Sequence, residues 1–246
     1  MLAKRYVLLM SVLCSVACSQ LSPFEKRDRD ATNIHLQLGQ HYLTMNMLDI
    51  AKENLEQALK DDSSNTLAHN TLAVLYNRIG EYDNARSEFE KALDLAPDDM
   101  GVQNNFGQFL CDRGELSRGM TLLDKAGSNP LNRNPWLALT NAGYCQLKMQ
   151  QKTQAEAYFK QVLQINASYA PALLAMQKIS FERSDLWAAK GYWQRALNVG
   201  EQSPESLLIA LKTERALGNV ELAKEYQRLL VEKFPLSVEA KQNQLQ

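Results

Sequence analysis

The chain has 246 residues, of which 45% are hydrophobic and 22% charged, and its formal net charge is −1. This composition excludes an intrinsically disordered chain, and the lack of a positive excess argues against a nucleic-acid partner. Four cysteines are too few for a scaffold built from disulfides, and the low counts of glycine (11) and proline (7) favour long regular elements.

The N-terminus has the layout of a secretory signal peptide. Two basic residues precede an apolar run that is shorter than the roughly 20 residues of a membrane-spanning helix. The run ends in Ser-Val-Ala-Cys, from Ser15 to Cys18, which resembles the lipobox of bacterial lipoproteins, where the cysteine is lipidated and becomes the mature N-terminus. We therefore expect residues 1–17 to be a lipoprotein signal peptide and Cys18 to carry lipid. A plain signal peptide with an incidental cysteine is the alternative.

The residues after Cys18 indicate where such a lipoprotein would reside. Residue 19 is Ser, and the absence of an Asp there favours the periplasmic face of the outer membrane over the inner membrane. Several acyl chains on one cysteine anchor a protein firmly, whereas a single chain binds only marginally. Residues 18–31 are polar, carry a mixed-charge run and contain a Pro, so we expect a tether between lipid and folded domain.

The rest of the chain is one motif repeated six times. A small residue recurs at intervals of 34, 34, 36, 34 and 34 residues, at Ala51, Ala85, Gly119, Ala155, Ala189 and Ala223. A helix–turn–helix unit of 34 residues is the period of the tetratricopeptide repeat, or TPR. The repeats are assigned to residues 32–65, 66–99, 100–133, 136–169, 170–203 and 204–237. The sequence thus predicts an all-α, right-handed TPR solenoid of about twelve helices, followed by a polar tail, residues 238–246, that we expect to fray.

The spacing has a physical cause. Small residues let the two helices of a repeat, helix A and helix B, approach closely, while large apolar residues fill the space between neighbouring repeats. No repeat can bury its apolar face alone, so the stack of repeats is the stable unit.

Two segments depart from a generic TPR sequence. The first is Asn-Asn-Phe-Gly-Gln-Phe-Leu-Cys, residues 104–111, and the second runs from the Asn-Pro-Leu at 129–131 to the Asn-Ala-Gly-Tyr-Cys at 141–145. With the lipobox, the six repeats and the two extra residues between repeats three and four, these segments resemble the pilotins, type IV pilus biogenesis lipoproteins of the PilF/PilW group. The resemblance covers essentially the whole chain.

That resemblance implies a function in pilus assembly and twitching motility. Pilotins help the secretin, the ring-shaped pore through which the pilus exits, to reach the outer membrane and form multimers there. The implied partner is a protein, with no cofactor, nucleic acid or small-molecule substrate, and an anchored monomer is the simplest expectation. The chain lacks GxSxG, P-loop, HExxH and GxGxxG motifs, so we expect no enzyme. The alternative is a general TPR lipoprotein that scaffolds periplasmic cell-wall enzymes.

Helices A line the concave groove of a TPR protein, so the binding residues are expected on them. The candidates are mostly amide or apolar side chains: Gln40, Leu43, Asn70, Val74, Asn77, Arg78, Asn104, Gln108, Tyr144 and Leu147. Asparagine can hydrogen-bond the main chain of an extended partner whatever the partner's sequence. For each residue, a solvated helix face is the alternative.

Cys111 and Cys145 fall on helices A of adjacent repeats, and the periplasm is oxidising. A disulfide between them would join repeats three and four, and two buried free thiols are the alternative. The histidines, His35, His41 and His69, are not spaced with other ligands as a metal site, so structural roles are favoured.

Three further predictions concern one aromatic residue and two pairs of charged residues. Trp187 lies in the expected turn between the helices of repeat five, where an exposed aromatic side chain would mark a second contact surface. The acidic pair Asp98-Asp99 ends a repeat and is expected to solvate the turn or cap the next helix. Glu88 and Lys91 have the spacing of a surface ion pair.

Overall fold

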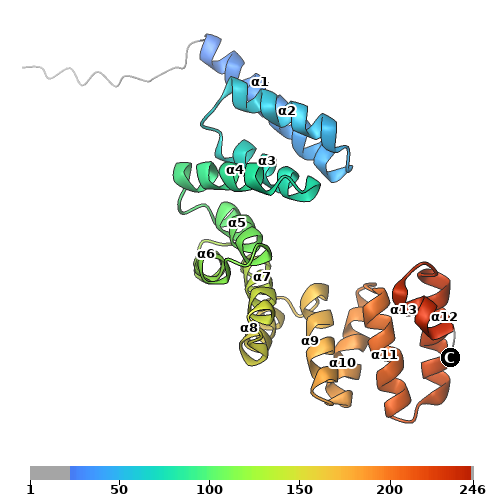
Figure 1. Ribbon diagram of the computed structural model, residues 1–246. Helices are drawn as coiled ribbons and strands as arrows, with labels where there is room; N and C mark the ends of the chain where they lie inside the picture. Colours follow the sequence, from blue (N-terminus) through green and yellow to red (C-terminus); the bar gives the residue numbers. More distant parts are fainter. Residues whose placement is uncertain (1–22, 245–246) are drawn as a thin grey trace, which may run out of the picture. The chain divides into compact units, whose positions relative to one another are not determined.

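The computed structural model describes residues 23–244, in which thirteen helices and no strands occur (Figure 1). The chain divides into two compact units, Met1–Asn65 and Thr66–Gln246. The first unit contains α1 (Pro23–Thr44) and α2 (Leu48–Asp61). The second contains α3 (Thr66–Ile79), α4 (Tyr82–Leu95), α5 (Met100–Asp112), α6 (Leu116–Ser128), α7 (Pro135–Lys148), α8 (Lys152–Ile165), α9 (Ala170–Glu182), α10 (Leu186–Asn198), α11 (Pro204–Ala216), α12 (Val220–Lys233) and α13 (Val238–Gln244). The predicted signal peptide, residues 1–17, and Cys18 lie outside the described residues.

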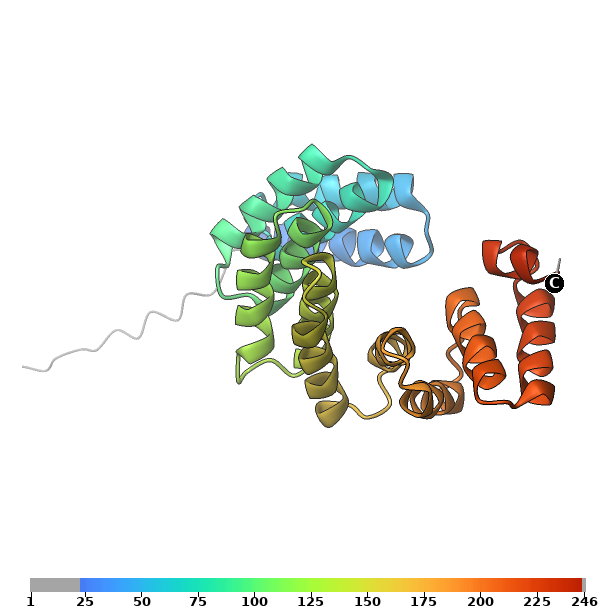
Figure 2. The same cartoon turned by 60° about the horizontal axis from the view of Figure 1, so that its bottom comes forward.

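The predicted repeats correspond to successive helix pairs, with α1, α3, α5, α7, α9 and α11 as helices A. The pair α11 and α12 lies side by side in both views (Figures 1 and 2). Small residues mark the contact between the paired helices: a Cβ atom at Gly39 would lie 2.6 Å from Cγ of Leu55, and one at Gly143 would lie 2.7 Å from the ring of Phe159. The prediction of an all-α TPR fold is confirmed. The small residues that recur at about 34-residue intervals are its physical basis, because they allow the two helices of a repeat to approach closely.

Each helix A turns into its helix B through a residue with left-handed backbone. The six residues have φ between 59° and 87°: Asn46, Gly80, Gly114, Gln150, Ser184 and Gly218. They recur at the same intervals as the small residues, 34, 34, 36, 34 and 34. Only three are glycine, so the glycine pattern of the sequence reveals half of these turns.

The 36-residue interval arises from a loop between α6 and α7. Its turns are closed by side chains: Asn129 accepts a hydrogen bond from the main-chain N–H of Leu131, and Asn132 accepts one from Asn134, both at 2.9 Å. The Asn132 amide also donates to the carbonyl oxygen of Ala126 at 2.7 Å. Side chains that close such Asx turns stabilise the conformation of the loop. The loop thereby accommodates the two extra residues that separate repeat three from repeat four.

Residues 238–244, predicted to be part of a frayed polar tail, form the helix α13. Ala240 is fully buried in a cluster with Leu207 and Leu230, so α13 covers the apolar end of the last repeat. The helix start is capped by Ser237, whose hydroxyl accepts from the N–H of Ala240 at 3.0 Å. At the other end, residues 23–31 of the predicted tether are helical, as the first part of α1. Glu, Lys and Arg in this segment are favourable helix residues.

The Asp98-Asp99 pair at the start of α5 supports a stability prediction. Asp99 is the N-cap residue, and its carboxylate accepts from the N–H of Val102 at 2.9 Å. We expect Asp99→Ala to lower the free energy of unfolding by about 1 kcal/mol, because this N–H loses its partner. Urea denaturation followed by circular dichroism measures the loss. Asp98→Ala, which leaves the cap intact, is the matched control, and equal losses for both variants would contradict the capping role.

Candidate protein-binding groove

Eight of the ten predicted groove residues lie on three neighbouring helices A of the second unit, where α5 packs against both α3 and α7. They are Asn70, Val74, Asn77 and Arg78 on α3, Asn104 and Gln108 on α5, and Tyr144 and Leu147 on α7. The other two, Gln40 and Leu43, lie on α1 of the first unit, and Leu43 is buried. The candidate groove of the second unit is thus formed by α3, α5 and α7.

Four asparagine side chains form a hydrogen-bonded series across these helices, which we call the amide ladder. The amide of Asn141 on α7 donates to Asn104 on α5 at 2.9 Å. Asn104 donates to its neighbour Asn105 at 3.1 Å, and Asn105 donates to Asn70 on α3 at 3.3 Å. The ladder therefore links three consecutive repeats through uncharged polar groups.

Two members of the ladder, Asn105 and Asn141, were not among the predicted groove residues. They lie two residues before Gly107 and Gly143, the small residues of helices A in repeats three and four. Once the two-residue insertion is counted, Asn105 and Asn141 hold the same position in consecutive repeats. That equivalence is the sequence signal that would have identified them.

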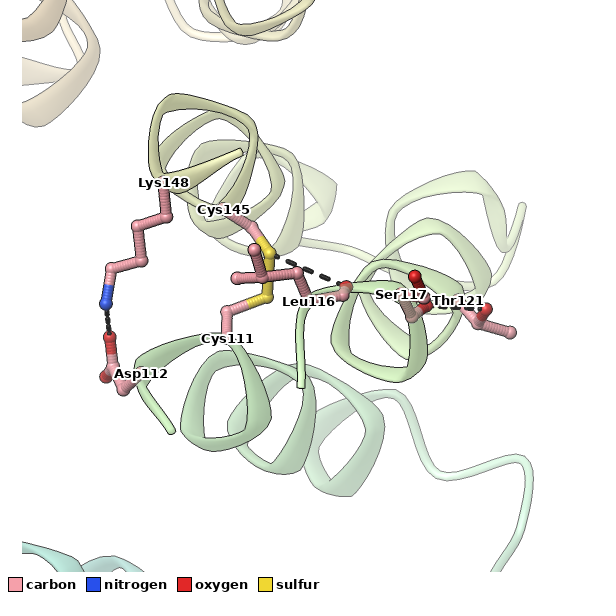
Figure 3. The surroundings of a disulfide bond; sticks show 7 residues. All are labelled: Cys111, Asp112, Leu116, Ser117, Thr121, Cys145 and Lys148. Carbon is pink, nitrogen blue, oxygen red and sulfur yellow. Dashed lines mark hydrogen bonds and ion pairs between the residues drawn. A yellow bond between two sulfur atoms is a disulfide. The ribbon is translucent and has the colours of Figure 1, made fainter. Parts of the chain in front are cut away.

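A disulfide joins α5 to α7, two of the three helices that carry the ladder. Cys111 on α5 and Cys145 on α7 are bonded, with their Cα atoms 5.5 Å apart (Figure 3). One sulfur lies 3.8 Å from the carbonyl oxygen of Leu116, and Lys148 forms an ion pair with Asp112 on the other side of the bond (Figure 3). The structure thus has the disulfide rather than the alternative of two free thiols.

A pocket of about 400 Å³ opens beside this bond, and we call it the α5/α7 pocket. Its lining combines the two cysteines with Gln108 and Asp112 of α5 and with Asn141, Tyr144, Leu147 and Lys148 of α7. Three of the predicted groove residues, Gln108, Tyr144 and Leu147, therefore meet here. Most of the exposed lining is apolar, and the ladder residue Asn141 is part of it.

Tyr144 is held between repeats four and five. Its ring packs edge-on against Phe159, with ring centroids 5.2 Å apart, and its hydroxyl donates to the carbonyl oxygen of Pro171 on α9 at 3.3 Å. Burial raises the pKa of the Tyr144 phenol above its ordinary value, and the nearby Tyr169 and Glu205 add to this effect. The hydroxyl therefore stays protonated at neutral pH and acts as a hydrogen-bond donor.

Two of the three histidines form pairs with carboxylates. His35 contacts Asp61 at 2.9 Å in the first unit, and His69 contacts Glu88 at 2.5 Å in the second. Glu88 also pairs with Lys91 at 2.7 Å. The Glu88 side chain is 12% exposed and that of Lys91 is 53% exposed, so only the lysine of the predicted surface pair lies at the surface. Within the described residues, no group of three or more His, Cys, Asp or Glu side chains is arranged to hold a metal ion.

Trp187 is the second residue of α10 and is 71% exposed, so it lies in the first helical turn rather than in the connection before it. The ammonium group of Lys190 lies 5.9 Å from the centre of its ring. No helix within residues 23–244 is long and apolar enough to cross a membrane.

Known proteins match this chain both in its repeats and over most of its length. Tetratricopeptide-repeat models match residues 36–99 and 138–169. The type IV pilus assembly protein PilF of Pseudomonas aeruginosa is 27% identical over 215 residues, which cover 87% of this chain and 85% of PilF. A crystal structure of PilW, a widely conserved type IV pilus biogenesis factor, matches with a TM-score of 0.77 and 32% identity over 86% of this chain and 97% of PilW. A P. aeruginosa PilF structure matches with a TM-score of 0.79 and 27% identity over 89% and 99% of the two chains.

The repeat phase and the paired helices define a TPR protein, a class that builds surfaces for binding other proteins. Within that class, the chain belongs to the PilF/PilW family of type IV pilus biogenesis proteins.

Proposed function

We propose that the protein is a pilotin. A lipid on Cys18 holds it at the periplasmic face of the outer membrane, and its TPR surface binds a protomer of the type IV pilus secretin. This binding promotes delivery of the secretin to the outer membrane and its assembly into multimers. The protein acts as an assembly factor that binds its partner without catalysing a reaction.

The observation that carries the proposal is family membership over most of the chain, since the PilW and PilF structures match 86% and 89% of it and are themselves covered to 97% and 99%. Two further features support it. The Ser-Val-Ala-Cys sequence ending at Cys18 has the form of a lipidation site. The groove on α3, α5 and α7 offers amide groups and an apolar pocket, which suit a polypeptide partner.

Deletion of the gene tests the proposal directly. We expect the deletion strain to contain secretin monomers in place of heat-stable multimers and to lose twitching motility. The reason is that the secretin lacks the protein that delivers it to the outer membrane and promotes its assembly there. Gel electrophoresis of unheated and heated envelope fractions measures the multimer. Normal multimers in the outer membrane of the deletion strain would refute the pilotin role.

The role of the lipid anchor is tested separately by complementing the same strain with Cys18→Ala. We expect this variant to fail to place multimers in the outer membrane, since the acyl chains supply the location. Cys14→Ala is the matched control, because it also removes a cysteine of the N-terminal segment but leaves the lipobox intact. If Cys18→Ala restores outer-membrane multimers as well as Cys14→Ala does, the anchoring mechanism is wrong.

A pull-down with the full chain separates the pilotin from the alternative scaffold. A periplasmic fragment of the secretin is the expected ligand. Retention of cell-wall synthases without the secretin fragment would favour the scaffold for cell-wall enzymes instead.

A further inference from the structure

We propose that the α5/α7 pocket binds one apolar side chain of a partner segment in extended conformation, while the amide ladder hydrogen-bonds the main chain of that segment. The identity of the partner rests on the proposed function, whereas the chemistry of recognition rests on the groove itself.

The size and lining of the pocket favour an apolar side chain. The disulfide has no hydrogen-bond donor, and Leu147 adds further apolar surface. The polar side chains of the lining already have partners, since Asn141 donates to Gln108, Lys148 pairs with Asp112, and the Tyr144 hydroxyl donates to Pro171. A polar group inserted here would lose its water and would have to displace one of these partners. A volume of about 400 Å³ is at the small end of ligand sites, so it suits one or two side chains rather than a whole helix.

The charges along these helices are already paired, which argues against a charged ligand. Lys148 of α7 forms an ion pair with Asp112 of α5, and both residues line the pocket. On the next helices A, Lys178 of α9 pairs with Glu205 of α11 at 2.6 Å. A carboxylate or ammonium group of a partner would have to displace one of these ions, so electrostatic attraction contributes little to binding here.

The amide ladder favours an extended main chain. Each asparagine amide has two N–H donors and a carbonyl oxygen that accepts twice, and the ladder uses only part of this capacity. Asn104, Asn105 and Asn141 are only half-buried, so a ligand can reach them. An extended segment presents free N–H and C=O groups, whereas a helix satisfies its own and offers few to the ladder.

The test uses the full chain and labelled, overlapping 15-residue peptides that cover the periplasmic part of the secretin, with binding followed by fluorescence anisotropy. We expect the binding peptides to share one apolar residue whose replacement by Ala weakens binding at least tenfold. The Kd should change less than about threefold between 50 and 500 mM NaCl, because no ion pair forms with the ligand. A tenfold loss of affinity in salt, or no critical apolar residue, overturns the proposal.

A blocking variant places the ligand in the pocket. Gln108 is exposed and lines the pocket, so Gln108→Trp fills the space from the solvent side without entering the core. We expect it to weaken peptide binding at least tenfold. Gln161→Trp, on the exposed face of α8 and outside the pocket, should leave the Kd within twofold. Equal affinities for the two variants overturn the proposal, and circular dichroism verifies that both are folded.

The pocket and the secretin assignment can fail separately. If a secretin fragment binds wild type and Gln108→Trp equally well, the secretin remains the partner and the pocket is not its site. If no secretin peptide binds, a library of uncharged 15-residue peptides with a central Leu is the second probe. Library binding that is lost in Gln108→Trp supports the pocket and counts against the secretin segment, and no binding at all overturns the pocket.

Discussion

Gly119→Ala is expected to lower the free energy of unfolding by roughly 1–3 kcal/mol, although five of the six repeats already carry Ala at this position. A Cβ atom at Gly119 would lie 2.5 Å from Sγ of Cys111, 2.8 Å from the carbonyl oxygen of Gly107 and 3.0 Å from the main-chain nitrogen of Cys111. Two of these contacts involve main-chain atoms, so α5 and α6 must separate to admit the methyl group. Urea denaturation of the full chain measures the loss.

The matched control for this prediction is Gly191→Ala. Gly191 is also helical, but a Cβ atom there would meet no neighbouring atom within 4 Å. We expect a gain of about 0.5–1 kcal/mol, because Ala loses less conformational freedom than Gly in a helix. The two Gly→Ala changes should therefore have opposite signs. A stabilising effect of Gly119→Ala would show that repeat three tolerates the consensus residue and that the close approach of α5 and α6 is not essential.

Loss of the Cys111–Cys145 bond is expected to destabilise the second unit by roughly 3–4 kcal/mol. The bond joins residues separated by 34 positions, and a closed loop of this length restricts the unfolded chain considerably. We expect Cys111→Ala/Cys145→Ala to unfold at lower urea concentration than wild type, and a reducing agent to shift wild type in the same direction. Circular dichroism follows unfolding, and mass measurement after alkylation shows the state of the bond.

The double variant is its own control for side effects of the reducing agent. It has no bond to reduce, so its unfolding midpoint should be the same with and without reductant. A wild-type midpoint that does not move on verified reduction would mean that the bond contributes no stability. Any remaining difference between the double variant and wild type would then be due to the packing of two buried side chains.

The repeat architecture was predictable because it rests on local spacing. The small residues from Ala51 to Ala223 report helix contacts that recur in every repeat, so one sequence suffices to find them. The last helix was missed for the opposite reason. Residues 238–244 are polar in sequence, and only contact with the end of the last repeat shows that Ala240 has an apolar site to fill.

The candidate site was predictable in type but not in detail. The sequence indicated a groove rich in amide groups, and Asn70 and Asn104 do form part of the ladder. The partners of these side chains depend on how neighbouring repeats are stacked, so the hydrogen bond of Asn141 to Asn104 is seen only in the structure, although the equivalent positions of Asn105 and Asn141 can be read from the sequence. Likewise the distance between Cys111 and Cys145 depends on the packing of α5 against α7, so the sequence left both bonded and free cysteines open.

Three of the left-handed turns between helices A and B lower the stability of the protein, because their residue with positive φ is not glycine. Asn46, Gln150 and Ser184 hold a conformation that costs an ordinary residue on the order of 1 kcal/mol, whereas glycine adopts it freely. In repeats one, four and five, this backbone strain therefore offsets part of the stabilisation that the packing contacts provide. Natural proteins rarely reach their stability optimum. Glycine at these three positions would raise the free energy of unfolding without changing the groove, because each lies in a turn between helices A and B.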